Sequence, residues 1–188
     1  ITEPTAVSAS MGVPTMITCN GDANGNVTVN GSGGTVAGDY TYLWSNGQTT
    51  STATGLVAGS YTVTVKDDNN CSTSAGPVTI TEPTAVSASM GVPTMVSCNG
   101  GSDGSVTVTG SGGTVAGDYT YLWSNGQTTA TATGLVAGSY TVTVKDDNNC
   151  STSAGPITIT EVTPLSGTIG APTMVLCNGC LLYTSDAA

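Results

Sequence analysis

Residues 59–66 read GSYTVTVK, and the same eight letters return at residues 138–145. Apolar and polar residues alternate along this stretch, so Tyr61, Val63 and Val65 fall on one side of an extended chain and the threonines on the other. This two-residue period is typical of a β-strand with one buried face and one solvent face. The stretch therefore predicts an antiparallel sheet rather than a helical fold.

The sequence on either side of this strand has the same character. Short segments rich in Thr, Val and Tyr are separated by turns that contain Gly, Asn and Asp. We expect seven short strands in one unit, roughly at residues 5–11, 15–19, 26–31, 39–45, 49–55, 59–66 and 72–81. This pattern predicts an all-β fold, an antiparallel β-sandwich of immunoglobulin type.

The whole pattern repeats every 79 residues. ITEPTAVSASMGVPTM begins at Ile1 and again at Ile80, and only nine positions differ between the first 79 residues and the next 79. A tandem array is expected, because each unit then needs only to fold and to join its neighbours. The expected modules are repeat 1 at 1–82, repeat 2 at 83–161 and the truncated start of a third repeat at 162–179.

The last nine residues, 180–188, leave the repeat abruptly. They read CLLYTSDAA, whereas the period calls for a Gly/Asp/Ser turn followed by a VTV strand. This segment resembles the translation of a sequencing-library adapter. We therefore interpret it as a non-native tail and the chain as a metagenomic fragment of a longer protein.

Each complete repeat contains one pair of cysteines. The simplest interpretation is one disulfide per module, Cys19 with Cys71 and Cys98 with Cys150. Closing a loop of that size stabilises a small module by about 4 kcal/mol in the chain-entropy view. Disulfides indicate an oxidising compartment and hence an extracellular, cell-surface location. The alternative is a set of small buried thiols.

The charge balance excludes several classes of function. Twelve acidic residues and two basic residues give a net charge of −10 at pH 7, so nucleic acid and anionic membranes are not expected partners. The longest apolar runs are too short for insertion into a membrane. The sequence has no histidine, which removes the usual general base and the ligands of most zinc sites. We expect no enzyme activity.

Four aromatic side chains are expected in the cores of the modules. The tryptophans are the largest residues available to fill a small sandwich, and each tyrosine follows a turn where a tyrosine corner would return its hydroxyl to the backbone. The four residues are Trp44, Tyr61, Trp123 and Tyr140. Alternatively, Tyr40, Tyr42 and Trp44 would form an exposed strip that stacks on sugar rings.

One metal site is conceivable from the sequence. A Cys19–Cys71 bond would bring together two turns rich in carboxylate and amide oxygens, which are ligands that Ca²⁺ prefers. The candidate ligands are Asp22, Asn24, Asp67, Asp68, Asp103, Asp146 and Asp147. The other explanation is that tight turns favour Asp and Asn for conformational reasons. No other cofactor is expected.

Taken together, the motifs resemble the SprB-type repeat of cell-surface adhesins in gliding Bacteroidetes. They are CNG, GNVTVNGSGGT, YTYLWSNGQTT, ATGLVAGSYTVTVKDDNNC and VTITEP. The resemblance implies a large protein, exported by the type IX route, whose repeats form extended filaments for surface attachment or gliding. It also implies neighbouring repeats and a surface polysaccharide or substratum as partners. The alternatives are a carbohydrate-binding module or a spacer module of a secreted polysaccharide-processing protein.

Overall fold

The computed structural model describes residues 3–170, and every regular element within them is a β-strand. Repeat 1 contains β1 (Ser8–Met11), β2 (Gly25–Ser32), β3 (Thr41–Trp44), β4 (Thr52–Leu56), β5 (Gly59–Lys66) and β6 (Ser72–Ile80). Repeat 2 contains β7 (Ser87–Met90), β8 (Gly104–Ser111), β9 (Thr120–Trp123), β10 (Thr131–Leu135), β11 (Gly138–Lys145) and β12 (Ser151–Ile159). The tail at 180–188 and residues 171–179 of the third repeat lie outside the described residues.

Each repeat is a sandwich of two three-stranded antiparallel sheets, which confirms the predicted fold class. In repeat 1 the sheets have the orders β1-β2-β4 and β3-β5-β6, and repeat 2 has the same orders with the equivalent strands. The strand expected at 15–19 forms only an isolated bridge between Thr15 and Asn26. Beyond it the amide of Ile17 donates to the carbonyl of Thr81, so this segment leaves the sheet and joins the end of the module. Nowhere in residues 3–170 is there a helix long and apolar enough to cross a membrane.

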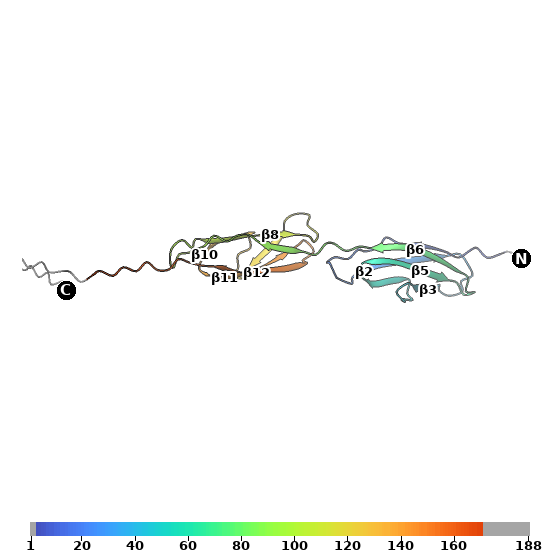
Figure 1. Cartoon of the computed structure of the whole chain (residues 1–188). Coiled ribbons are helices and arrows are strands. Elements are labelled where there is room, and N and C mark those ends of the chain that lie inside the picture. The colour runs from blue at the N-terminus through green and yellow to red at the C-terminus, as the bar shows by residue number, and fades with distance from the viewer. Residues whose placement is uncertain (1–2, 171–188) are drawn as a thin grey trace, which may run out of the picture.

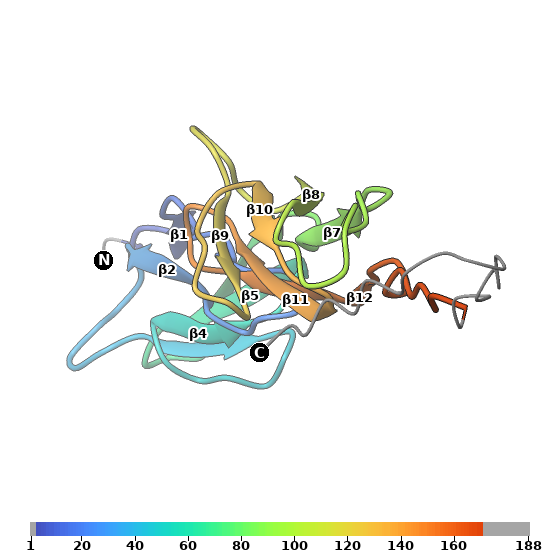
Figure 2. The ribbon, with the colours of Figure 1, turned by 90° about the vertical axis from the view of Figure 1, so that its left-hand side faces the viewer.

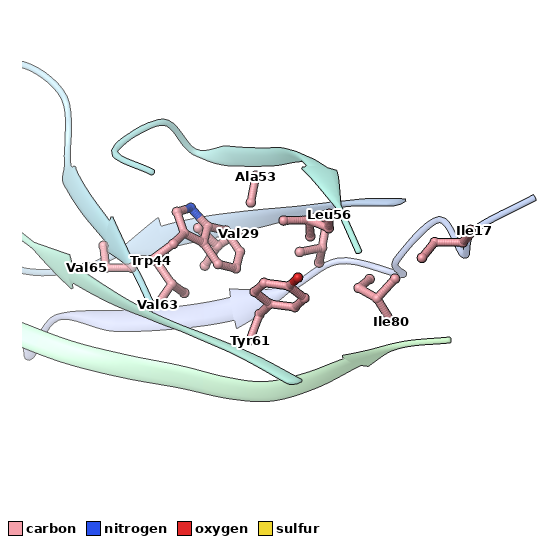
Figure 3. Packing of buried hydrophobic residues seen from close by; sticks show 10 residues of the cluster. Ile17, Val29, Trp44, Ala53, Leu56, Tyr61, Val63, Val65 and Ile80 are labelled. Atoms are coloured by element: carbon pink, nitrogen blue, oxygen red, sulfur yellow. The ribbon is translucent and has the colours of Figure 1, made fainter. Parts of the chain in front are cut away.

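The alternating residues of β5 form the centre of the core (Figure 3). Trp44 packs among them with 2% of its surface exposed, and its indole N–H donates to the carbonyl of Thr50 at 2.8 Å. The Tyr61 hydroxyl donates to the carbonyl of Val57 at 3.0 Å, which is the back-bond of a tyrosine corner. Repeat 2 contains the same arrangement around Trp123 and Tyr140.

The two ends of a module are distinguished by which strands begin and finish there. A Cβ placed on Gly25 would lie 2.8 Å from Ile80 and 2.9 Å from the carbonyl oxygen of Leu56, so β2 starts where β4 and β6 finish. β5 also starts there, because Gly59 pairs with Ile80. We call this the exit end, since the chain leaves the module from it, and we call the opposite end the entry end.

The two modules lie end to end along one axis (Figure 1). The exit end of repeat 1 meets the entry end of repeat 2. Seen along that axis, the equivalent strands β4 and β10 lie on different sides, so repeat 2 is turned relative to repeat 1 (Figure 2). The contacts at this joint decide how an array of such modules is built.

Candidate functional site at the joint between repeats

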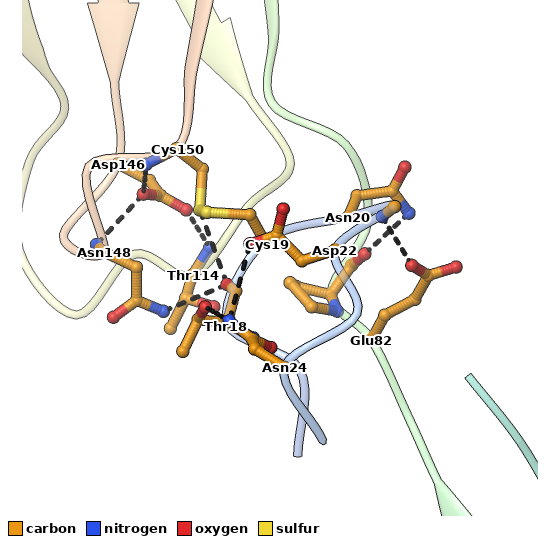
Figure 4. Close-up of a disulfide and its surroundings, with 12 residues drawn as sticks. Thr18, Cys19, Asn20, Asp22, Asn24, Glu82, Thr114, Asp146, Asn148 and Cys150 are labelled. Carbon is orange, nitrogen blue, oxygen red and sulfur yellow. Dashed lines mark hydrogen bonds between the residues drawn. A yellow bond between two sulfur atoms is a disulfide. The ribbon is translucent and has the colours of Figure 1, made fainter. Parts of the chain in front are cut away.

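A disulfide joins the two modules. Cys19 of repeat 1 is bonded to Cys150 of repeat 2 across 131 residues of sequence, with their Cα atoms 5.5 Å apart (Figure 4). The predicted pairs Cys19–Cys71 and Cys98–Cys150 are therefore wrong. Within the described part of the chain, Cys71 and Cys98 are free and exposed.

The geometry of the sandwich explains why the prediction failed. Cys19 lies at the exit end, next to the end of β6, whereas Cys71 lies in the turn between β5 and β6 at the entry end. The nine residues of β6 separate these ends by about 27 Å at the usual rise per residue. A disulfide needs Cα atoms within about 7 Å, so the two cysteines of one module cannot pair.

The turn that carries Cys19 is stabilised by the side chain of Asn24, which bonds to Thr18 on the other side of the turn. Asn24 accepts a hydrogen bond from the Thr18 amide at 3.2 Å and donates to the Thr18 hydroxyl at 2.5 Å. Repeat 2 forms the same clamp with different residues, because Asp103 accepts from the Ser97 amide at 3.0 Å and from its hydroxyl at 2.5 Å. Two of the nine differences between the repeats thus lie on the two sides of one contact.

Glu82 fastens this turn to the segment that leads into repeat 2. Its carboxylate accepts from the Gly21 amide at 2.6 Å, and the Asn20 side chain donates to the carbonyl of Pro83 at 3.0 Å. The expected boundary between the repeats, at residues 82 and 83, placed Glu82 in the joint but gave it no role. The available signal was one glutamate per period, at Glu3, Glu82 and Glu161, in a chain with few charges.

On the other side of the joint, a buried carboxylate shapes the turn that carries Cys150. Asp146 is 3% exposed and accepts from the amides of Thr114, Asn148 and Cys150 at 2.8–3.0 Å. Gly113 leaves room for it, because a Cβ there would lie 2.5 Å from the carboxylate and the φ of +68° also favours glycine. This fixed turn presents the sulfur of Cys150 to repeat 1.

The equivalent carboxylate of repeat 1 is organised in the same way. Asp67 accepts from the amides of Thr35, Asn69 and Cys71 at 2.8–3.0 Å. The hydrogen bond from Thr35 is the main cause that holds the pKa of Asp67 below its ordinary value, against the opposing effect of burial. The Asp67 turn thus has the same three hydrogen bonds as the Asp146 turn, although no second module within residues 3–170 packs against it.

Two further contacts cross the joint beside the disulfide. The Asn148 side chain donates to the carbonyl of Thr18 at 3.3 Å. The sulfur of Cys150 lies 3.4 Å from the same oxygen, which is a packing contact, because a disulfide sulfur carries no proton. A small hollow remains beside the bond, lined by Cys19, Asn20, Ala85, Val86, Cys150 and Ser151.

Within one module the structure separates the residues considered as calcium ligands. Asp22 and Asn24 lie at the exit end of repeat 1, whereas Asp67 and Asp68 lie at its entry end. Asp68 accepts from the amides of Ala37 and Gly38, and Asp147 does the same from Ala116 and Gly117. Residues 3–170 contain no group of three or more acidic, cysteine or histidine side chains that could hold a metal ion. Apart from Asp22, these carboxylates accept hydrogen bonds from backbone amides of their own turn or of a facing loop.

Comparison with known proteins places this arrangement in context. The family model of the SprB repeat matches residues 12–49 and 91–128. Among solved structures, the chain is similar to the three N-terminal domains of the highly immunogenic outer capsid protein (Hoc) of bacteriophage RB49, with 21% identity and a TM-score of 0.46. That match covers 84% of this chain and 59% of the Hoc chain. A search of curated proteins finds no significant match. One segment in each 79-residue unit thus matches the SprB repeat.

Proposed function

We propose that this chain is a structural repeat segment of a large, secreted cell-surface adhesin. Its repeats would form an extended, disulfide-stapled filament that serves surface attachment or gliding. The partners of a repeat are then its two neighbours in the chain, and the partner of the filament is a surface polysaccharide or substratum. The SprB-type repeats support the adhesin part of this proposal.

The observation that carries the filament is the joint. A covalent bond, the Glu82 clamp and the contact from Asn148 hold the exit end of one repeat against the entry end of the next. The Asn148 contact lies beside the disulfide, whereas the Glu82 clamp holds the connecting segment at a second point, and connections at two points restrain bending as well as separation. A disulfide between repeats also favours an oxidising, extracellular location.

The carbohydrate-binding alternative loses its main support. It required exposed tryptophans that could stack on sugar rings, but Trp44 and Trp123 are each 2% exposed. Tyr40 is also occupied, because its hydroxyl donates to the carbonyl of Gly33 at 2.7 Å and its ring contacts Gly31. The remaining distinction is between an adhesive filament and a passive spacer.

Location and adhesion can be tested in cells that produce the parent protein. An antibody raised against the 188-residue chain should label intact, non-permeabilised cells, and its Fab fragments should reduce attachment of those cells to a surface. Fab fragments of an unrelated antibody provide the control. Labelling only after lysis would refute the surface location, and labelling without any effect on attachment would favour the spacer.

The filament itself can be tested on the purified chain by small-angle X-ray scattering. We expect the scattering profile of the oxidised protein to be that of a rod two modules long. A profile of two modules packed side by side, or of two freely jointed modules, would contradict the proposal.

A further inference from the structure

The exit end of repeat 2 carries a second copy of the half-joint that repeat 1 presents to its neighbour. Gly100 donates to Glu161 at 2.7 Å, as Gly21 donates to Glu82, and the Asn99 side chain donates to the carbonyl of Val162 at 3.3 Å. The Val96 amide donates to the carbonyl of Thr160 at 2.9 Å, as Ile17 donates to Thr81. Cys98 is therefore held in repeat 2 by a turn equivalent to the one that positions Cys19 in repeat 1.

The entry end of repeat 1 carries a second copy of the opposite half-joint. Cys71 follows a turn with the same three amide bonds to Asp67 that Asp146 accepts in repeat 2. The backbone agrees as well, since Asn70 and Asn149 have φ values of 62° and 64°. Both halves of the joint are thus built before a partner is present.

Exposure distinguishes the paired from the unpaired copies. Cys150 is 9% exposed and Cys19 is half-buried, whereas their equivalents Cys71 and Cys98 are exposed. Because Cys71 lies at the entry end of repeat 1 and Cys98 at the exit end of repeat 2, the two thiols lie at opposite ends of the rod (Figure 1). They cannot pair with each other within one chain.

We propose that Cys98 and Cys71 are the bonding ends for a following and a preceding repeat of the same kind. Each repeat would bond its first cysteine to the second cysteine of the next repeat, 131 residues farther along, as Cys19 does with Cys150. The array then carries one disulfide at every joint and none within a module. This proposal concerns the construction of the array and does not depend on its role as an adhesin.

The chemistry requires an external oxidant. Two thiols form one disulfide and lose two protons and two electrons, so a disulfide donor such as a thiol oxidoreductase or oxidised glutathione accepts them and becomes two thiols. The half-joints favour this exchange only where the ends of two repeats meet.

A chain with one more repeat tests the proposal, and the single lysine in each 79-residue unit makes the result easy to read. Residues 80–158 are duplicated in tandem after residue 158, and Cys177→Ser and Cys180→Ser remove the two cysteines that follow the last complete repeat. Trypsin cleaves after Lys66, Lys145 and the added copy of Lys145, which yields four fragments. The oxidised protein is alkylated, denatured, digested without reductant and analysed by mass spectrometry.

We expect two separate linked pairs, the first fragment with the third and the second with the fourth. Four fragments joined in a single species would mean pairing within modules and would overturn the proposal, as would a fourth fragment with an alkylated cysteine. Only the monomer, separated by size in denaturant without reductant, is digested, because Cys71 and the added copy of Cys98 are free to bond the ends of two molecules. As a control, Cys98→Ser should abolish only the pair of the second and fourth fragments.

Discussion

Removal of the disulfide between the repeats should destabilise both modules, although neither module contains a disulfide of its own. The perturbation is the double substitution Cys19→Ser and Cys150→Ser. If repeat 2 unfolds while repeat 1 stays folded, the disulfide and the clamped segment at Glu82 close a loop of about 67 residues in the unfolded part. The chain-entropy relation assigns about 4 kcal/mol to a loop of that length. The same argument applies when repeat 1 unfolds, since Cys19 is then held at repeat 2.

The assay is thermal unfolding monitored by the fluorescence of Trp44 and Trp123, which are buried in separate modules. For a module of this size the loss corresponds to a fall in melting temperature on the order of 20 °C. The matched control is Cys71→Ser with Cys98→Ser, which should leave stability unchanged because both thiols are exposed. If the control loses as much stability as the double substitution, the bonds lie within modules and the reasoning fails.

Three further changes and one addition test other parts of the structure. Trp44→Ala should cost about 3–5 kcal/mol because it empties the core of repeat 1, whereas Leu43→Ala on the same strand, 55% exposed, should cost little; equal losses in thermal unfolding would contradict this core. Glu82→Gln should lower the stability of repeat 1 by about 1 kcal/mol, since a charge-assisted bond to an amide becomes a neutral one, and Glu3→Gln serves as its control. The free energy of unfolding should fall below about pH 4, because folding lowers the pKa values of Asp67 and Asp103. The stabilisation by these carboxylates is fully present above the unfolded pKa of 3.8 and is lost as the pH falls through the folded pKa. Asp67→Asn should reduce this dependence of stability on pH. Calcium at millimolar concentration should leave the melting temperature unchanged, whereas a saturable rise would support the calcium hypothesis.

The sequence was sufficient for the parts of the fold that depend on local pattern. The alternation of Tyr61, Val63 and Val65 matches the buried face of β5, and the position of Trp44 among turns predicted its place in the core. These features depend on side chains a few residues apart, so the amino-acid sequence alone reveals them. The strand predicted at 15–19 does not form, because the path of this segment depends on a hydrogen bond from Ile17 to Thr81, far along the sequence. Local pattern does not reveal such a contact.

The disulfide could not be predicted because it depends on the direction of each strand. Four strands separate Cys19 from Cys71, and a chain that reversed at every turn would return to the same end of the module. Instead, β3 and β4 both run toward the exit end, because β3 is antiparallel to β5 and β4 is antiparallel to β2. The chain changes sheets between them without reversing, and this places Cys71 at the entry end.

The short distance along the chain from Cys150 to Glu161 has a mechanical consequence. The disulfide places repeat 1 at the start of β12, and this single strand runs through repeat 2 to its exit end. Tension between repeat 1 and the chain beyond Glu161 is therefore carried by roughly 11 residues, whose fully extended length is about 37 Å. Within the folded module β12 already spans about 27 Å, so complete unfolding of the rest of repeat 2 would release only on the order of 10 Å. Without the disulfide the same event would release most of a 79-residue chain, about 270 Å when extended. A filament joined in this way keeps its length under load even when a module along it melts.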